Sequence, residues 1–389
     1  MIGAHASGPA RRIARSPTGT FAVHPFHGRA GTLRSLNRAR VGALPVGLDE
    51  PDALGKTGFQ LATGWSLAQD LQSAAEALDL DPATPDWPRA LDRILTAPHT
   101  LPAHHQRAES IARRFGRRLG CLLLALKLGA PETRAARPEW HDEHWAFWAG
   151  LHRVVIGGGL LSGRLGELAL PAAQAVLDAH GAADLRLTRS PFGAHLALVG
   201  LARCGPAPTT DRYVFDFGQT SIKRGIARYS DGRLAWLELL PTLASVCPPL
   251  ADIPLTQNDA ARQWARMLAI VKDCVRTFET GGPVELGLCL ACYLFDGHPA
   301  PDDVGCYGRL SLLAPNLRDW MCAQLQDTLG RGVRLHLLHD GGAAALSDEG
   351  GRDSLVLTIG TALGSGFSDV SDGLTELARG FTLISPRPL

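Results

Sequence analysis

The apolar positions between Asp211 and Glu349 change from the alternation of strands to the spacing of helices and back. Three short apolar runs come first and are separated by turn residues, which predicts an antiparallel meander. Apolar residues near i, i+3 and i+4 then predict helices that are separated by apolar strands. The predicted elements are strands at 213–218, 222–230, 234–240, 284–295 and 333–340, and helices at 259–280, 316–330 and 341–349. In chain order the pattern is βββαβαβα.

A second unit begins at Ser354, where an apolar strand, a glycine-rich turn and a returning strand follow one another. The residues that remain up to Leu389 are too few to complete a domain. Residues 108–204 have the pattern that is missing, namely helix, strand, helix, strand and helix. The expected division is a large lobe of residues 46–204 plus 354–389, a proline-containing linker at 204–211 and a small lobe of residues 211–350.

The charge and hydropathy of the 389-residue chain indicate which kinds of partner it is expected to bind. Lys and Arg total 39 against 38 Asp and Glu, so neither nucleic acid nor an anionic membrane is expected as the main partner. The sequence has no run of about 20 apolar residues and no apolar segment of a secretory signal at its start. We expect a cytoplasmic protein that binds a small molecule, with residues 1–45 as a mobile basic arm.

Most of the eight cysteines lie inside apolar runs, which is typical of buried free thiols in a reduced compartment. Cys289 and Cys292 form a C-x-x-C pair, but no second pair or nearby histidine completes a zinc set. Because a strand would direct these two side chains to opposite faces, we expect no metal at this pair.

Three glycine-rich turns each follow an apolar strand, and two of them carry hydroxyl side chains. A single such turn most often only makes a hairpin. Three turns that combine backbone N–H groups with hydroxyls are typical of a cradle for phosphate oxygens. Asp216 precedes the first turn at a strand end, where a carboxylate suits magnesium, directly or through water. The predicted cradle consists of Gly218, Thr220, Ser221, Gly360, Thr361 and Gly364, and the third turn consists of Gly157, Gly158 and Gly159.

Asp340 lies at the carboxyl end of an apolar strand, directly before a helix of small residues. Such a position lies in the crevice where α/β sheets bind their ligands. A carboxylate there can accept a hydroxyl proton and orient the attacking oxygen. The alternative is that Asp340 only caps the helix, and the local sequence by itself favours that alternative.

These segments together resemble the ROK (repressor, open reading frame, kinase) family of sugar kinases, within the actin-like ATPase superfamily. The segment DFGQTSIKRGI, which begins at Asp216, is similar to the family's first phosphate loop, with Gln219 in place of a glycine. LTIGTALGSGF and HDGGAAALSDE resemble its second phosphate loop and the segment of its catalytic aspartate. RVVIGGGLLSGRL and SPFGAHLALVGLA resemble its adenosine loop and closing helix, but here they precede the first phosphate loop. The chain therefore resembles a circular permutant of the family.

The resemblance implies an α/β fold of two ribonuclease-H-like lobes with a cleft between them, in permuted chain order. It implies ATP-dependent phosphorylation of a hydroxyl on a sugar or sugar-like molecule, with ATP and magnesium as cofactors, and it allows a homodimer. The adenosine side and the second phosphate loop would belong to the large lobe, and the first loop and the base to the small lobe. The implied roles are Asp340 as base and substrate contact, Asp216 as magnesium ligand, Gly157, Gly158 and Gly159 as adenosine floor, Lys223 as phosphate contact or exposed lysine, and Asn316 as substrate contact or helix cap.

The chain also departs from the family. The family's zinc motif and its Glu and His sugar contacts are absent, so no structural zinc is expected and the sugar is not specified. Gly342 stands where the family has an asparagine. These departures leave a non-catalytic ligand sensor as the alternative, whereas the retention of both Asp216 and Asp340 favours an enzyme.

Overall fold

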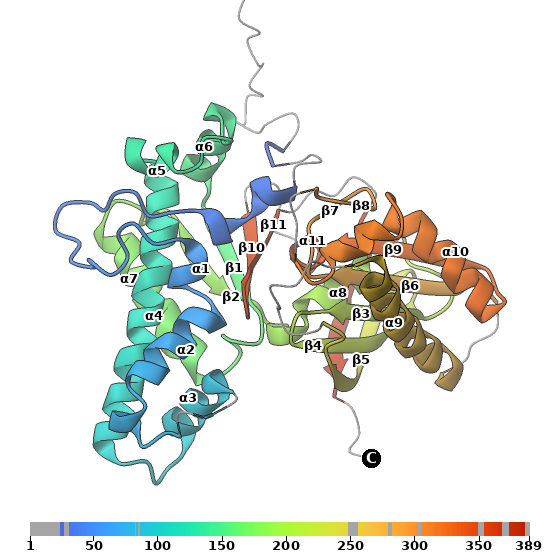
Figure 1. The fold of residues 1–389 in the computed structure, drawn as a ribbon, viewed down its shortest axis with the longest axis horizontal. Coiled ribbons are helices and arrows are strands. Elements are labelled where there is room, and N and C mark those ends of the chain that lie inside the picture. The colour runs from blue at the N-terminus through green and yellow to red at the C-terminus, as the bar shows by residue number, and fades with distance from the viewer. Residues whose placement is uncertain are drawn as a thin grey trace, which may run out of the picture.

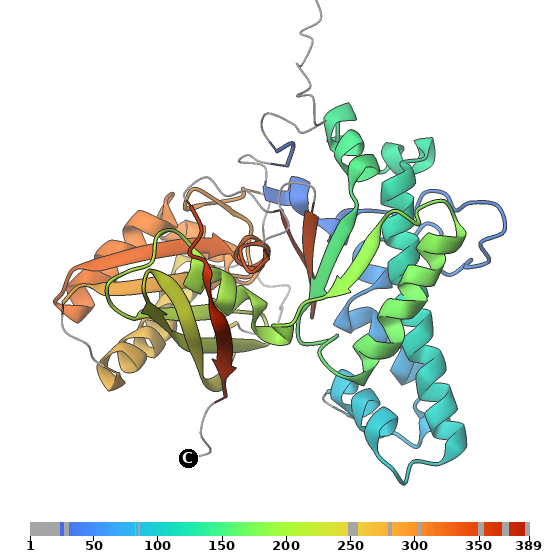
Figure 2. The same cartoon turned by 180° about the vertical axis from the view of Figure 1, so that it is seen from behind.

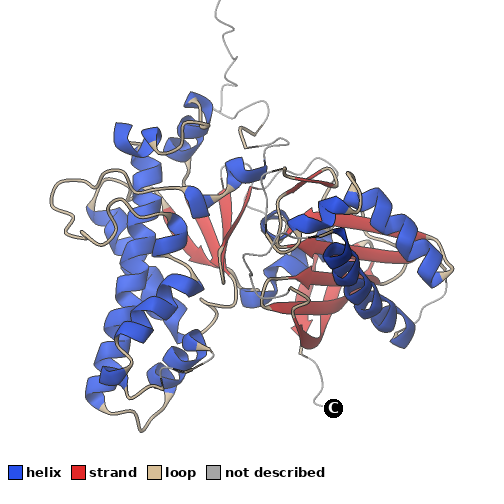
Figure 3. Ribbon diagram, viewed as in Figure 1, coloured by secondary structure: helices blue, strands red, loops and turns tan. Residues whose placement is uncertain are grey.

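The computed structural model describes residues 24–26, 31–81, 83–84, 86–247, 256–278, 282–301, 305–348, 354–367 and 373–385. Over these residues the chain is a mixed α/β protein with a four-stranded sheet, a six-stranded sheet and a two-stranded hairpin (Figures 1 and 3). The four-stranded sheet lies in the half of the molecule with the long helix α4, and the six-stranded sheet lies in the other half (Figure 1).

The six-stranded sheet has the order β12–β5–β4–β3–β6–β9. Strands β3, β4 and β5 are antiparallel neighbours, which confirms the predicted meander, and β6 and β9 extend the sheet in parallel with β3. Tyr213 and Phe215 pack with α9 and α10 on one face, whereas Val214 packs with α8 and α11 on the other. The bounds are β3 Arg212–Phe217, β4 Ser221–Ser230, β5 Arg233–Ala244, β6 Val284–Leu290, β9 Val333–His339, β12 Leu377–Ile384, α8 Leu196–Arg203, α9 Gln257–Thr277, α10 Leu317–Leu329 and α11 Asp340–Ala345.

The four-stranded sheet has the order β11–β10–β1–β2 and joins segments from distant parts of the chain. β1 is parallel to both β10 and β2, with Arg153 opposite Ser354, so the strand at Ser354 shares a sheet with residues 153–157 and 186–189 of the expected large lobe. The expectation that all of residues 354–389 belong to the large lobe is wrong for β12. That strand pairs in parallel with β5, at the edge of the six-stranded sheet (Figure 2). The bounds are β1 Arg153–Gly157, β2 Arg186–Arg189, β10 Ser354–Ile359 and β11 Leu363–Phe367.

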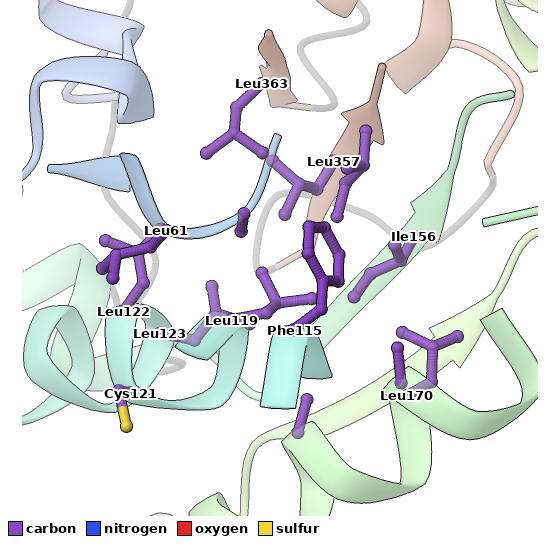
Figure 4. Close-up of a cluster of buried hydrophobic side chains, with 14 of the residues drawn as sticks. Leu61, Phe115, Leu119, Cys121, Leu122, Leu123, Ile156, Leu170, Leu357 and Leu363 are labelled. Atoms are coloured by element: carbon purple, nitrogen blue, oxygen red, sulfur yellow. The ribbon is translucent and has the colours of Figure 1, made fainter. Parts of the chain in front are cut away.

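The large helices cover the four-stranded sheet and form one core with it. Phe115 and Leu119 of α4 point toward Ile156 of β1 and Leu357 of β10, and Leu170 of α7 lies beside them (Figure 4). All these side chains are buried or nearly so, which makes their removal from water the main source of stability in this half. The helices are α1 Gly58–Leu61, α2 Gly64–Ser73, α3 Trp87–Thr96, α4 Pro102–Leu128, α5 Pro131–Ala135, α6 Asp142–Gly150 and α7 Arg164–Ala179; short 3₁₀ helices span Gly31–Arg34, Leu36–Arg38, Glu76–Leu78, Gly193–His195 and Gly308–Leu312, and the hairpin is β7 Leu294–Phe295 with β8 His298–Pro299.

The N-terminal segment is part of this core wherever the structure describes it. Phe26 is 2% exposed and stacks on Phe367 of β11, with the ring centroids 4.7 Å apart. Leu36 and Val41 are fully buried. The prediction of a mobile arm over residues 1–45 is therefore wrong for Phe26, Leu36 and Val41. Their side chains pack in one core with α4 and β11. Residues 1–23 lie outside the described part.

The prediction that the cysteines are free thiols is wrong for two of them. Cys247 and Cys306 form a disulfide, and the other six remain thiols. The two cysteines come from segments 59 residues apart that meet beside the turn between β3 and β4. Among the described residues, no helix is long and apolar enough to cross a membrane.

Candidate active site

A cavity of about 200 Å³ lies between the two sheets, and its walls come from both. It collects turns that follow the carboxyl ends of β1, β3, β9 and β10, which is where α/β sheets commonly place ligands. Most of the residues that the sequence singles out therefore meet here, although they are far apart in the chain. They are Gly158, Gly159, Asp216, Gly218, Thr220, Ser221, Lys223, Asp340, Gly360, Thr361 and Gly364.

Asp216 and Lys223 face each other across the first hairpin, because they are direct partners in the β3–β4 register. Lys223 Nζ lies 2.9 Å from Asp216 Oδ2, and the Cys289 thiol lies 3.5 Å from Asp216 Oδ1. The Asp216 charge raises the pKa of Lys223, which keeps the ammonium protonated. The exposed-lysine alternative is wrong, because Lys223 is mostly buried and lines the cavity.

Asp340 is the first residue of α11, and its Oδ1 accepts the Gly341 backbone N–H at 2.6 Å. The same oxygen lies 2.8 Å from His339 Nε2. Burial raises the pKa of Asp340, but His339, the Gly341 N–H and the Lys223 charge outweigh it and hold the pKa below its ordinary value. The carboxylate is thus ionised at neutral pH. Its contribution to folding stability is present above the ordinary pKa and disappears as the pH falls through the folded value.

Asp340 does not act as the N-cap of α11. His339 takes that place, since its Nδ1 accepts the Gly342 N–H at 3.3 Å. His339 is the most important site residue that the sequence interpretation missed. Its ring stacks on Tyr293, with centroids 4.6 Å apart, and both residues line the cavity. The signal available in the sequence was a polar, aromatic residue directly before the candidate base.

Close backbone contact places Asp340 beside the second hairpin. Gly366 of β11 lies so near Gly341 of α11 that a Cβ at Gly366 would overlap the Gly341 carbonyl oxygen. The helix start can therefore approach β11 only because both residues are glycines. This contact brings Asp340 to the turn that holds Gly360, Thr361 and Gly364.

Side chains outside the predicted motifs support both hairpins. Asn37 donates from Nδ2 to the Leu363 carbonyl at 2.7 Å and accepts the Leu363 N–H at 2.9 Å. The hydroxyls of Ser245 and Tyr307 both donate to the Gly218 carbonyl, at 2.8 and 3.2 Å. Ser245 and Tyr307 adjoin the disulfide cysteines closely in sequence, so the disulfide joins the two segments that hold the first hairpin.

Two predicted site residues do not line the cavity. Asn316 is the N-cap of α10, and its Oδ1 accepts the Asp319 N–H at 3.2 Å. The prediction of a substrate contact is therefore wrong for Asn316, and the helix-cap alternative holds. Gly157 is the last residue of β1 and lies beneath Leu196, whereas the neighbouring Gly158 and Gly159 reach the cavity.

The strand pairing and the cavity define a mixed α/β protein with a candidate ligand site at the strand ends.

No family model matches the chain. No curated protein matches it. Among solved structures, it is similar to the PPX-GPPA enzyme of Aquifex aeolicus at 17% identity and a TM-score of 0.21, covering 36% of this chain and 42% of that one. It is similar to RuvC of Thermus thermophilus at 14% identity and a TM-score of 0.21, covering 33% of this chain and 64% of that one. The matches span less than two thirds of either protein and assign no family.

Proposed function

We propose that the protein is an ATP-dependent phosphotransferase that phosphorylates a hydroxyl of a sugar or sugar-like molecule, with Asp340 as the base. The observation that carries the proposal is the convergence, in one cavity, of an ionised aspartate, a lysine–aspartate pair and two hairpins with glycines and hydroxyls. Phosphoryl transfer relies mainly on positioning and on neutralising charge, which these groups supply.

The hairpins fit the phosphates of ATP. A Cβ at Gly159 or Gly360 would meet nothing within 4 Å, so a ligand oxygen can come close to the backbone at both positions. Thr220, Ser221 and Thr361 add hydroxyls along the same wall. Lys223 contributes a buried positive charge next to the first hairpin, and a phosphate oxygen can share it with Asp216.

Magnesium also fits the residues present. The ion usually binds one or two protein carboxylates together with waters and substrate phosphates, and this cavity holds the two carboxylates of Asp216 and Asp340. Asp216, which also pairs with Lys223, and Asp340 would hold the ion together with water and the phosphates. When bound, magnesium would neutralise part of the phosphate charge.

Asp340 is suited to receive the proton of the attacking hydroxyl. Within the described residues, Gly341 and His339 both contact Oδ1 of Asp340, and neither contacts Oδ2, which we assign to the substrate. The lowered pKa makes Asp340 a weak base that is always ionised at neutral pH. Its main contribution is therefore to orient the hydroxyl and to accept the proton late in the reaction.

The second candidate is a ligand sensor without catalysis, and the size of the cavity favours it. About 200 Å³ is below the range of roughly 300–1,000 Å³ that is typical of pockets for small molecules. For the enzyme, the two sheets must move apart to admit a whole nucleotide and close again over the substrates. For the sensor, a small polar ligand alone fills the site.

The test is Asp340→Asn, which keeps an oxygen that can accept the Gly341 N–H and removes the charge. We expect phosphorylation to fall by at least about 100-fold while ATP affinity changes little. The matched control is Asp231→Asn, in the exposed turn between β4 and β5, where Asn tolerates the positive φ of 52°.

More than about a tenth of the wild-type turnover in Asp340→Asn would overturn the role as base. A thermal-shift screen of sugars, with and without magnesium ATP, separates the two candidates. If sugars stabilise the wild-type protein but it phosphorylates none of them, the sensor replaces the enzyme.

A further inference from the structure

The two sulfurs of the Cys247–Cys306 disulfide differ in exposure. Cys306 is buried, at 5% exposure, whereas Cys247 is only partly buried. The other six cysteines are thiols, so the same chain holds sulfur in both oxidation states. Because thiol–disulfide exchange begins with a thiolate that reaches one sulfur of the bridge, the exposed Cys247 is the sulfur open to attack.

A buried glutamine marks Cys306 as the sulfur that leaves. Gln263 is 3% exposed, and its Nε2 donates to Cys306 Sγ at 3.2 Å. An N–H donor stabilises the negative charge that develops on a leaving thiolate, and so favours exchange in this direction. Among the described residues, Oε1 of Gln263 has no hydrogen-bond partner. By turning over, the same amide can accept the S–H of reduced Cys306, so Gln263 suits both oxidation states.

The Cys306 side of the bridge is fixed by contacts of its own. Tyr307 is fully buried, and its ring lies against Phe217, with the centroids 6.2 Å apart. Arg309 Nε donates to the Cys306 carbonyl at 2.9 Å. None of these contacts involves the disulfide. Tyr307 therefore keeps its hydrogen bond to the Gly218 carbonyl when the bridge opens.

The Cys247 side carries the other support of the first hairpin. Ser245 Oγ donates to the Gly218 carbonyl at 2.8 Å and accepts the Cys247 N–H at 3.0 Å. The Ser245 N–H donates to the Thr220 carbonyl at 3.4 Å. Just beyond Ser245, the chain is held by the buried Val246 and by the disulfide. Opening the bridge removes one of these two restraints, so its effect is local to Ser245 and the hairpin.

We propose that Cys247 is a thiol-exchange site through which a dithiol reductant controls the first hairpin. A thiolate of the reductant attacks Cys247 Sγ, the bond to Cys306 breaks, and Cys306 leaves as a thiolate that takes a proton from water. The second thiolate of the reductant then displaces Cys247, which is protonated in turn, and closes the reductant's own disulfide. The protein gains two electrons and two protons, and the dithiol loses as many.

Reduction frees Ser245 to leave the Gly218 carbonyl, while Tyr307 stays. One lost hydrogen bond of this kind changes an equilibrium constant roughly 2- to 10-fold. The turn of the first hairpin is then less ordered, and phosphate binding at this turn weakens by a similar factor. The weaker phosphate binding rests on the proposed function, whereas the exchange at Cys247 and the release of Ser245 do not.

The experiment compares the oxidised and the reduced full chain, with dithiothreitol as the dithiol probe. Alkylation and mass spectrometry count the thiols after the native protein has been quenched in acid. We expect the count to rise from six to all eight cysteines while the circular dichroism stays that of the folded protein. Amide exchange of residues 217–222 should then accelerate roughly 2- to 10-fold, and that of residues 359–363 in the second hairpin should not change.

Calorimetry with magnesium tripolyphosphate measures the effect on the phosphate site. We expect the reduced chain to bind this probe roughly 2- to 10-fold more weakly than the oxidised chain. If both forms bind it equally, redox control of the site is refuted and the proposed phosphate site stands. If neither form binds it although residues 217–222 exchange faster after reduction, the release of the hairpin stands and the proposed function fails.

Two variants test the path through Ser245. In Ser245→Ala, residues 217–222 should exchange fast already in the oxidised form, and reduction should add little. Cys322→Ser is the matched control, because it removes another partly buried sulfur, on α10, that is not part of the bridge. It should respond to dithiothreitol as the wild type does.

Two results would overturn the proposal. One is a disulfide that dithiothreitol opens only after the chain has unfolded, since Cys247 would then not be a site of exchange in the native protein. The other is an equal acceleration by reduction in Ser245→Ala and in the wild type, since Ser245 would then not link the disulfide to the hairpin.

Discussion

The two hairpins that form the cavity have similar sequences and different supports. Each is an apolar strand, a glycine, a hydroxyl residue and a returning strand. The first hairpin, between β3 and β4, is held at the Gly218 carbonyl by Ser245 and Tyr307, which belong to the same half of the molecule. The second, between β10 and β11, is held by Asn37 and by the Gly64 N–H, which donates to the Gly360 carbonyl at 2.7 Å.

This difference shows that a loop motif specifies a turn but does not specify the groups that support the turn by hydrogen bonds. The first hairpin accepts two hydroxyl hydrogen bonds at one carbonyl, so either donor can be lost while the other remains. The second depends on one amide side chain from the N-terminal segment, on the Gly64 N–H and on the glycine contact with α11. We therefore expect the second hairpin to be the more sensitive of the two.

The largest effect is expected for Gly366→Ala. The new Cβ overlaps the Gly341 carbonyl oxygen, so α11 and β11 must separate. We expect the free energy of unfolding to fall by about 3 kcal/mol or more, measured by denaturant titration. The control is Gly360→Ala in the same hairpin, where the Cβ meets nothing within 4 Å. Equal losses in the two variants would contradict the role of the glycine contact.

A smaller effect is expected for Asn37→Ala. It leaves the N–H and the carbonyl of Leu363 without their partner, at a cost of about 2 kcal/mol. Amide hydrogen exchange should accelerate in the second hairpin and stay unchanged in the first. Asn316→Asp serves as the control, because Asp caps α10 as well as Asn does. Faster exchange spread evenly over both hairpins would show that Asn37 supports the whole fold instead.

The smallest effect is expected for Tyr307→Phe. It removes one of the two donors to the Gly218 carbonyl, while Ser245 keeps its bond, so the cost is about 1 kcal/mol or less. Tyr229→Phe loses a comparable bond, to the Ala202 carbonyl, away from the cavity. Both should lower stability by similar amounts, and only Tyr307→Phe should weaken phosphate binding in calorimetry. If Tyr307→Phe lowered the free energy of unfolding as much as Asn37→Ala, the two hairpins would not differ in sensitivity.

The sequence was sufficient to predict the elements that depend on patterns of neighbouring residues. Alternation and turn residues were enough for the meander of β3, β4 and β5, and the same register makes Asp216 and Lys223 partners. The placement of β10 in one lobe with β1 came from the element order and from the resemblance to a circular permutant, and the parallel pairing of the two strands agrees with it. The strand pattern also placed Asp340 at a strand end, but the local sequence favoured a helix cap there, and the role as base came from the resemblance.

What the sequence did not reveal depends on contacts between distant segments. Asn37 and Leu363 are 326 positions apart, and the Cys247–Cys306 disulfide joins residues 59 apart. The edge strand β12 is half exposed, so its pattern of side chains does not specify which sheet it joins.

The sequence by itself therefore determined the two hairpins and the places of Asp216 and Asp340 at strand ends, since strand period and turn chemistry act over a few residues. Only the tertiary structure decided that the Gly341 N–H would bond to Asp340 beside the second hairpin and that the N-terminal segment would hold this hairpin. The reason is physical: a hydrogen bond requires its two atoms to be about 3 Å apart, and that closeness is set by the packing of α11, β11 and the N-terminal segment.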